Sequence, residues 1–233
     1  MLKKQLNIVC TICVRSGSKS IKRKGLKKIN NKSLFQITLE QSIKSNIFNS
    51  ILISSDDEKI MNISKNYSVD FIYNRPKNLS GDKVPKIDVI KNLIRNYQNF
   101  NKHQKIDLVV DLDVTVPSRA IKDIKGAINF IKKNKKSSNL IAITKAKKNP
   151  YFNMIEFKNK KISMCKKTIN TSSRQTVPKV YEVSSSFYIW KINNLLKSKK
   201  ILNKNTIAYE IPYIRSIDID NEVDLFLMKK VMN

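Results

Sequence analysis

The sequence predicts an α/β fold, because strand-like and helix-like hydrophobic patterns alternate along the chain. Short runs of β-branched and aliphatic residues at 8–14, 51–53 and 106–112 are typical of buried strands. Apolar residues recur at helical spacing over 34–46 and 86–97. With 233 residues and a hydrophobic fraction of 41%, the chain is long enough for one substantial domain.

The first strand runs directly into a basic loop at 15–20 that also contains small residues. Gly17 and the neighbouring serines allow backbone N–H groups to converge on an anion. Without a bound anion, the cations of the loop and of the residues just after it would repel one another; they are Arg15, Lys19, Lys22, Arg23 and Lys24. We therefore expect a nucleotide phosphate here, and a solvated basic turn is the alternative.

Two common types of phosphate loop do not match this segment. A P-loop requires glycine immediately before Lys19, where Ser18 stands. The dinucleotide fingerprint requires three spaced glycines, whereas the loop has only Gly17. The expected phosphate site is therefore of another kind.

The remaining elements follow the same alternation. Residues 54–58 combine a Ser/Asp cap with acidic residues, which is typical of a helix start, and this helix should run to about Tyr67. Further strands are predicted at 71–73, 140–144 and 185–190, and short alternating strands between 147 and 162. Further helices are predicted at 120–133 and, after the segment 216–224, up to Met232.

The composition favours anionic ligands without choosing among them. The formal net charge is +28, but only 7 of the 46 basic residues are arginine, and the lysines are spread over the whole chain. A base-reading protein would favour arginine for its bidentate fork. The pattern resembles a compositional bias more than a stripe that follows nucleic acid, so we expect neither nucleic acid nor a membrane as a partner.

The N-terminal residues and the cysteines indicate a reducing compartment. No stretch approaches the roughly 18 apolar residues of a membrane span, and 1–14 is interpreted as a strand without a signal-peptide cleavage site. Cys10 and Cys13 form a CxxC pair, but residues three apart in a strand point to opposite faces. We therefore expect free thiols and a cytoplasmic location.

The basic loop resembles the opening signature of the cytidylyltransferases that activate nonulosonic acids such as sialic acid. Four residues fall on the positions of that motif: Arg15, Ser18, Lys19 and Lys24. Ser20 replaces a glycine of the motif, and Gly25 replaces an asparagine that helps hold the cytidine in the family. A second element, with Arg75 and Asp82, resembles the family's Arg-Pro-x-x-Leu-x-x-Asp segment, although 83–85 departs from its small residues.

The middle of the chain is similar to the branch of this family that acts on legionaminic acid. The resemblance rests on three segments: 111–119, with an Asp-Leu-Asp-x-Thr-x-Pro-x-Arg pattern, 149–153 (NPYFN) and 173–179 (SRQTVPK). By this resemblance Asp113 and Thr115 contact the sugar at the end of a parallel strand. The same resemblance implies that Arg174 and Gln175 contact the sugar across a dimer interface. Tyr188 is a weaker candidate for a sugar contact, because a tyrosine in an apolar strand more often belongs to the core.

The last motif, Asp-Ile-Asp-x-Glu-x-Asp, matches the family closely. Strand alternation puts Asp218 and Asp220 on one face, where a divalent cation would relieve the repulsion between their charges. A capping cluster before the final helix is the alternative. The resemblance implies that these two carboxylates bind Mg²⁺.

The resemblance therefore implies a three-layer α/β/α, Rossmann-like nucleotidyltransferase fold (GT-A-like) with a mostly parallel sheet. It implies one domain over 1–233, with a dimerisation lobe inserted at about 147–182, and a homodimer. The reaction would be CTP plus a nonulosonic acid, most like legionaminic acid, giving a CMP-sugar and pyrophosphate. The catalytic residues would be Arg15, Lys19 and Lys24, and the nucleotide-binding residues Arg15, Gly17, Ser18, Lys19, Lys24, Arg75 and Asp82.

Three alternatives remain open at this stage. The first is activation of another sugar acid, such as 3-deoxy-manno-octulosonate, on the same fold. The second is a nucleic-acid-binding protein driven by charge, which would require basic residues interleaved with aromatics on one face. The third is a family member that binds without catalysis, which the departures at Ser20, Gly25 and 83–85 would favour and the intact Asp218 and Asp220 oppose.

Overall fold

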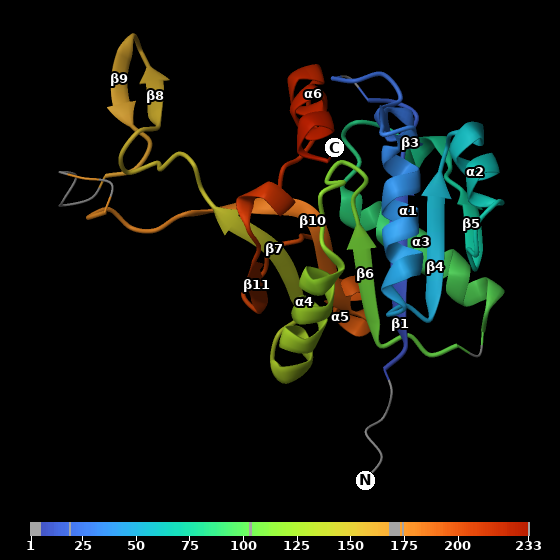
Figure 1. The fold of residues 1–233 in the computed structure, drawn as a ribbon. Helices are drawn as coiled ribbons and strands as arrows, with labels where there is room; N and C mark the ends of the chain where they lie inside the picture. Colours follow the sequence, from blue (N-terminus) through green and yellow to red (C-terminus); the bar gives the residue numbers. More distant parts are fainter. Residues whose placement is uncertain (1–5, 19, 103, 168–172, 174, 233) are drawn as a thin grey trace.

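A computed structural model describes residues 6–18, 20–102, 104–167, 173 and 175–232. Its centre is a seven-stranded sheet with the order β11-β7-β10-β6-β1-β4-β5 (Figure 1). The strands of this sheet are β1 (Ile8–Val14), β4 (Ser50–Ser55), β5 (Phe71–Asn74), β6 (Leu108–Leu112), β7 (Asn139–Lys145), β10 (Tyr181–Lys191) and β11 (Thr206–Glu210). The order brings the carboxyl ends of β1, β4 and β6 side by side.

The sheet is mostly parallel, as expected. β1 pairs in parallel with both β4 and β6. The pair β4 and β5 and the pair β7 and β11 are also parallel. β10 is the exception, because it runs antiparallel between β6 and β7. The pairing of β10 with β7 shifts register between Ser184 and Tyr188, so the bulge there lies next to the end of β6.

Helices cover both faces of the sheet and make the three layers. One buried core joins the sheet to α1 (Leu34–Ser45), α2 (Glu58–Ser64), α4 (Ile121–Lys133) and α6 (Glu222–Val231). A second core on the opposite face joins it to α3 (Lys86–Phe100) and α5 (Ile192–Lys197). The predicted α/β/α architecture is confirmed.

The alternation of β1 explains the CxxC pair. Cys10 belongs to the first core, whereas Cys13 packs against the second. Both thiols are free, as the strand geometry predicts. Burial and the nearby charge of Asp111 raise the pKa of the Cys13 thiol to about 12, so this thiol is protonated at neutral pH.

Several smaller elements were not predicted. They are the short strands β2 (Lys28–Ile29) and β3 (Lys32–Ser33), the 3-10 turns η1 (Lys24–Leu26), η2 (Lys77–Leu79) and η3 (Tyr213–Arg215), the helix α5 and the edge strand β11. β11 is only partly buried, so it lacks the continuous apolar run that identifies central strands.

The segment between β7 and β10 leaves the body of the sheet. It contains a hairpin of β8 (Ile155–Lys158) and β9 (Lys161–Met164), which projects away from the three layers (Figure 1). Every residue of β8 is exposed. Among the described residues, no helix combines the length and the apolar character needed to cross a membrane.

Candidate active site

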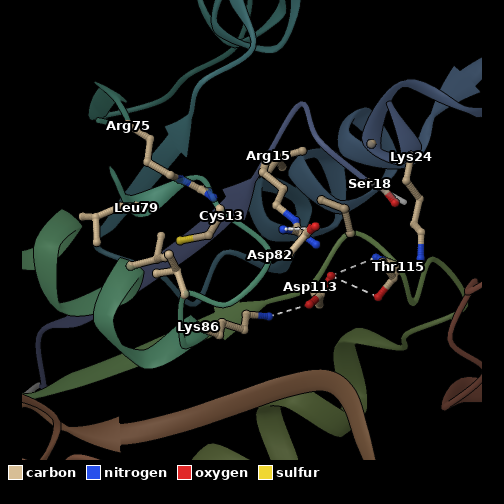
Figure 2. A pocket seen from close by; sticks show the side chains of 16 residues that line it. Cys13, Arg15, Ser18, Lys24, Arg75, Leu79, Asp82, Lys86, Asp113 and Thr115 are labelled. Carbon is tan, nitrogen blue, oxygen red and sulfur yellow. Dashed lines mark hydrogen bonds and ion pairs between the residues drawn. The ribbon is translucent and has the colours of Figure 1, made fainter. Parts of the chain in front are cut away.

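A cavity of about 280 Å³ opens at the carboxyl ends of the central strands (Figure 2). Four segments line it: the end of β1 with the basic loop, the turn η1, the loop 75–86 with the first turn of the following helix α3, and the residues just after β6. Ligands of open α/β sheets bind in this position, because loops from adjacent strands meet there. The cavity gathers these expected site residues: Arg15, Ser18, Lys24, Arg75, Asp82, Asp113 and Thr115.

The cationic side of the cavity comes from the basic loop and η1. Arg15 Nη1 lies 2.6 Å from Asp82 Oδ1, so this ion pair joins the basic loop to the loop 75–86 (Figure 2). Lys24 Nζ lies 3.2 Å from Asp220 Oδ1, and its side chain is 13% exposed. In both cases a carboxylate holds a cation that could instead bind a phosphate group.

The basic loop is anchored to the start of α2 rather than free in solvent. Asp56 accepts hydrogen bonds from both Ser16 N (2.8 Å) and Ser16 Oγ (2.7 Å). Asp57 caps α2 through Lys59 N and also receives a bidentate pair from Arg23. Burial opposes this charge, but the contacts with Arg23 lower the pKa of the Asp57 carboxyl overall. The predicted helix start is confirmed, and the cap has a second role in holding the loop, but α2 ends at Ser64 rather than at about Tyr67.

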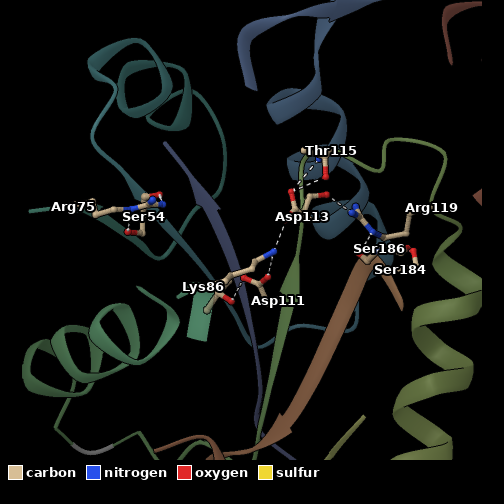
Figure 3. Close-up of polar contacts among 10 residues, drawn as sticks. Ser54, Arg75, Lys86, Asp111, Asp113, Thr115, Arg119, Ser184 and Ser186 are labelled. Carbon is tan, nitrogen blue, oxygen red and sulfur yellow. Dashed lines mark hydrogen bonds and ion pairs between the residues drawn. The ribbon is translucent and has the colours of Figure 1, made fainter. Parts of the chain in front are cut away.

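Arg75 is buried at the end of β5. Its guanidinium donates to the side chain of Ser54 (3.2 Å) and to the backbone carbonyl of the same residue (2.8 Å). These bonds fix Arg75 against the end of β4 at the wall of the cavity (Figure 3).

The opposite side of the cavity carries the Asp113 carboxylate. Asp113 Oδ1 accepts hydrogen bonds from Thr115 N (3.1 Å) and Thr115 Oγ1 (3.0 Å), and Asp113 Oδ2 lies 2.5 Å from Lys86 Nζ. Burial alone would raise the pKa of Asp113, but the neighbouring Lys86 ammonium and the Thr115 hydrogen bonds lower it. Asp113 is therefore held as an anion.

The 218–220 segment lies beside the end of β6, because Ile219 N donates to the carbonyl of Thr115 (2.9 Å). Ile219 is buried, whereas Asp218 is half-buried and Asp220 is exposed. Burial, and to a smaller extent the charge of Asp113, raises the pKa of Asp218. Neither Asp218 nor Asp220 lines the first cavity, although Asp220 pairs with Lys24, which does. Asp218 lines a second cavity of about 160 Å³ beside β10, together with Ser184 and Ser185.

These carboxylates can accept a divalent cation. Within the described part of the chain, the buried Asp218 Oδ1 atom has no well-formed hydrogen bond, although the Ser185 and Thr115 hydroxyl groups lie close enough to the carboxyl group to oppose the rise in its pKa. No three histidine, cysteine or carboxylate side chains among the described residues converge to hold a metal on their own. Mg²⁺ keeps several waters and needs only one or two carboxylates plus substrate phosphates, so the donor set fits this ion.

Some expected site residues lie away from the first cavity. Gly17 is exposed, and a Cβ there would meet nothing within 4 Å. Tyr188 is buried on β10, where it stacks on Trp190 and packs 5.3 Å from Lys86 Nζ. Gln175 is exposed in the segment between β7 and β10. Lys19 and Arg174 lie outside the described residues.

Two site residues were not identified from the sequence. Lys86 pairs with Asp111 as well as Asp113. Arg119 is buried and donates to the Ser186 carbonyl, to Gln41 Oε1 and to the Asp113 carbonyl (Figure 3). One feature of the sequence could have identified Lys86. It stands at the first position of a predicted helix, where the macrodipole disfavours a positive charge, so a lysine there indicates a tertiary partner.

The chain is similar to known proteins over nearly its whole length. A family model described as Cytidylyltransferase matches residues 9–204. Post-translational flagellin modification protein B of Campylobacter coli is 35% identical over 227 residues, which cover 96% of this chain and 95% of that protein. CMP-N,N'-diacetyllegionaminic acid synthase of Campylobacter jejuni is 34% identical over 223 residues, with coverage of 95% and 93%.

More distant relatives extend the comparison. Pseudaminic acid cytidylyltransferase of Campylobacter jejuni is 29% identical over 225 residues, which cover 95% of this chain and 94% of that protein. The solved structure of CMP:2-keto-3-deoxy-manno-octonic acid synthetase complexed with CTP superposes with a TM-score of 0.72, covering 97% of this chain and 98% of the other. At 12% sequence identity this structural likeness establishes the fold alone.

Proposed function

Because the chain belongs to the cytidylyltransferase family, we propose that it transfers CMP from CTP to a nonulosonic acid and releases pyrophosphate. Legionaminic acid is the proposed acceptor, since a legionaminate synthase is 34% identical over most of both chains. The observation that carries the proposal is the cavity itself, which places the cations Arg15 and Lys24 opposite the Asp113 carboxylate at the carboxyl ends of β1 and β6. The octulosonate alternative is supported only by a fold likeness.

The cationic side would bind the triphosphate of CTP. Arg15 and Lys24 would exchange their present carboxylate partners for phosphate oxygens. The hydroxyl at the sugar's anomeric carbon would attack the α-phosphorus in line and release its proton to solvent, while the bond from the α-phosphorus to the pyrophosphate oxygen breaks. Such a transfer depends on positioning and on neutralising charge. Lys19, Gly17, Ser18, Arg75 and Asp82 complete the proposed nucleotide side.

Asp218 and Asp220 would hold Mg²⁺ beside the phosphates. Bound there, the ion would neutralise charge on the α-phosphate and lower the pKa of a hydroxyl that it touches. Asp220 would have to leave Lys24 for this role, and the exposed side chain of Asp220 allows such movement. Asp113 and Thr115, with Arg174, Gln175 and Tyr188, form the proposed acceptor side.

Pyrophosphate release tests this function. The wild-type protein would be incubated with CTP, Mg²⁺ and a panel of legionaminic, pseudaminic, sialic and 3-deoxy-manno-octulosonic acids. We expect release to be fastest with legionaminic acid, and Asp220→Ala to lower it by roughly 10²- to 10³-fold, as for loss of a group that stabilises transition-state charge. Preference for another acid would refute the proposed acceptor alone. CTP binding without release from any acid would refute the enzymatic function and favour a binding role.

The segment at about 147–182 is the proposed dimerisation lobe of a single domain over 1–233. Its hairpin exposes large apolar side chains on both strands, which are Ile155 (56% exposed), Phe157 (73%) and Ile162 (61%). Exposed apolar groups of this size favour a protein–protein interface. In a homodimer the lobe would bring Arg174 and Gln175 toward the cavity of the second copy.

Replacing Phe157 with serine should shift the dimer toward monomer, because the substitution removes apolar area from the proposed interface. Sedimentation velocity over a dilution series would measure an increase of about tenfold or more in the dissociation constant. Phe100→Ser is the matched control, since Phe100 is also 73% exposed but lies at the end of α3. A wild-type protein that is monomeric throughout the series would contradict the dimer.

We place the reaction in the cytoplasm. The free thiols of Cys10, Cys13 and Cys165 are compatible with a reducing compartment. The proposed substrate CTP is a nucleotide of that compartment.

A further inference from the structure

Lys86 occupies an unfavourable position for a lysine. It is the first residue of α3, preceded by Pro85, which supplies no side-chain cap. A positive charge at a helix N-terminus opposes the macrodipole. Tertiary contacts must therefore stabilise the Lys86 ammonium in this position. The Lys86 ammonium lies 2.7 Å from Asp111 Oδ2 and 2.5 Å from Asp113 Oδ2 (Figure 3).

Asp111 is a rigid anchor for this ammonium. It lies within β6 and is fully buried. Its other oxygen, Oδ1, accepts a hydrogen bond from Thr11 Oγ1 at 2.9 Å, and Thr11 is its register partner on β1. Burial alone would lower the pKa of Lys86, but Asp111 and Asp113 together raise it. The ammonium is therefore charged and held at the centre of the sheet.

The second contact of the ammonium fixes Asp113. One oxygen of Asp113 is held by Thr115, the other by Lys86, and the Asp113 carbonyl accepts from Arg119. Lys86 also ends the loop 75–86, which lines the cationic side of the cavity. A single ammonium thus joins that loop to the end of β6.

We propose that Lys86 is a positioning residue: anchored by Asp111, it sets the orientation of Asp113 and the separation between the nucleotide side and the acceptor side of the cavity. The inference rests on the proposed function for its kinetic consequence. Misplacement of reacting groups by about 1 Å can cost on the order of 10²-fold in rate. The ring of Tyr188, 5.3 Å from the ammonium, packs against it from β10.

The kinetic test separates positioning from folding with three variants: Lys86→Met, Asp111→Asn and their combination. Lys86→Met leaves two neighbouring carboxylates buried, so we expect the unfolding midpoint to fall by on the order of 10 °C. We expect kcat/KM for the acid to fall by roughly 10²-fold and KM for CTP to change less than about threefold. Lys122→Met, an exposed lysine in the first turn of α4, should leave all three values unchanged.

The combined variant decides between the two roles. Asp111→Asn removes the repulsion between carboxylates, so the combination should recover most of the unfolding midpoint while kcat/KM for the acid stays low. Recovery of kcat/KM together with the midpoint would show that Lys86 only stabilises the fold. A raised KM for CTP with unchanged use of the acid would show that Lys86 is a direct nucleotide ligand. Either result would overturn the inference.

A second measurement keeps the inference testable if the wild-type protein uses none of the acids. In that case the proposed function fails, and the contact itself is tested by a thermal-unfolding cycle of Lys86→Met, Asp113→Asn and both together. A combined loss clearly smaller than the sum of the single losses supports the orienting contact. Additive losses would overturn it, whatever the reaction proves to be.

Discussion

Lys24→Met is expected to lower the rate of pyrophosphate release by roughly 10²- to 10³-fold, which is the cost of losing one group that stabilises charge in a transition state. Lys24 lines the cavity, and its largely buried ammonium already binds a carboxylate, Asp220 Oδ1, at 3.2 Å. In the reaction it would face the departing pyrophosphate, where negative charge accumulates. Steady-state kinetics with saturating CTP and acid would measure the loss.

Lys27→Met is the matched control for this substitution. Lys27 directly follows η1, and it also pairs with a carboxylate near the start of α6, Glu222 Oε1, at 3.1 Å. It does not line the cavity, and its side chain is 38% exposed. We expect less than about a twofold change, because exposed ion pairs contribute little. Equal losses in both variants would mean that general charge, rather than the position of Lys24, supports the reaction.

Arg119→Met is expected to destabilise the protein by about 3 to 5 kcal/mol, because it removes one partner from a buried charged network. Arg119 Nε donates to the Ser186 carbonyl in the β10 bulge (2.5 Å), and Nη1 donates to Gln41 Oε1 (3.0 Å). Burial lowers the pKa of its guanidinium to about 10, so it remains charged at neutral pH. Urea unfolding monitored by circular dichroism would measure the change.

Arg95→Met serves as the control for Arg119→Met. Arg95 is exposed on α3, where removal of a cation should change the free energy of unfolding by less than about 0.5 kcal/mol. A change in Arg119→Met as small as that of the control would mean that water replaces the guanidinium in the bulge of β10. The network would then contribute nothing to the junction between β6 and β10.

Features that depend on nearby residues could be predicted, whereas features that depend on contacts between distant strands could not. The buried strand at 8–14, a helix start within 54–58 and the opposite faces of Cys10 and Cys13 were all predicted correctly, and each depends on neighbours within a few residues. The extension of β10 back to Tyr181 was missed, because its first residues are exposed. Its antiparallel direction depends on strands that are distant in sequence.

The α/β class and the motifs that carry the family relationship could be predicted from the sequence, since both depend on local periodicity and on residue type. The partners of the buried charges could not be predicted, because they depend on contacts between distant segments. Lysine and arginine usually lie on the surface of a protein. Nothing near Lys86 or Arg119 in the chain identifies Asp111 or the carbonyl of Ser186 as a contact. A buried carboxylate is tolerated only where a partner offsets its desolvation. Folding selects that partner when it brings α3 and β10 against β6.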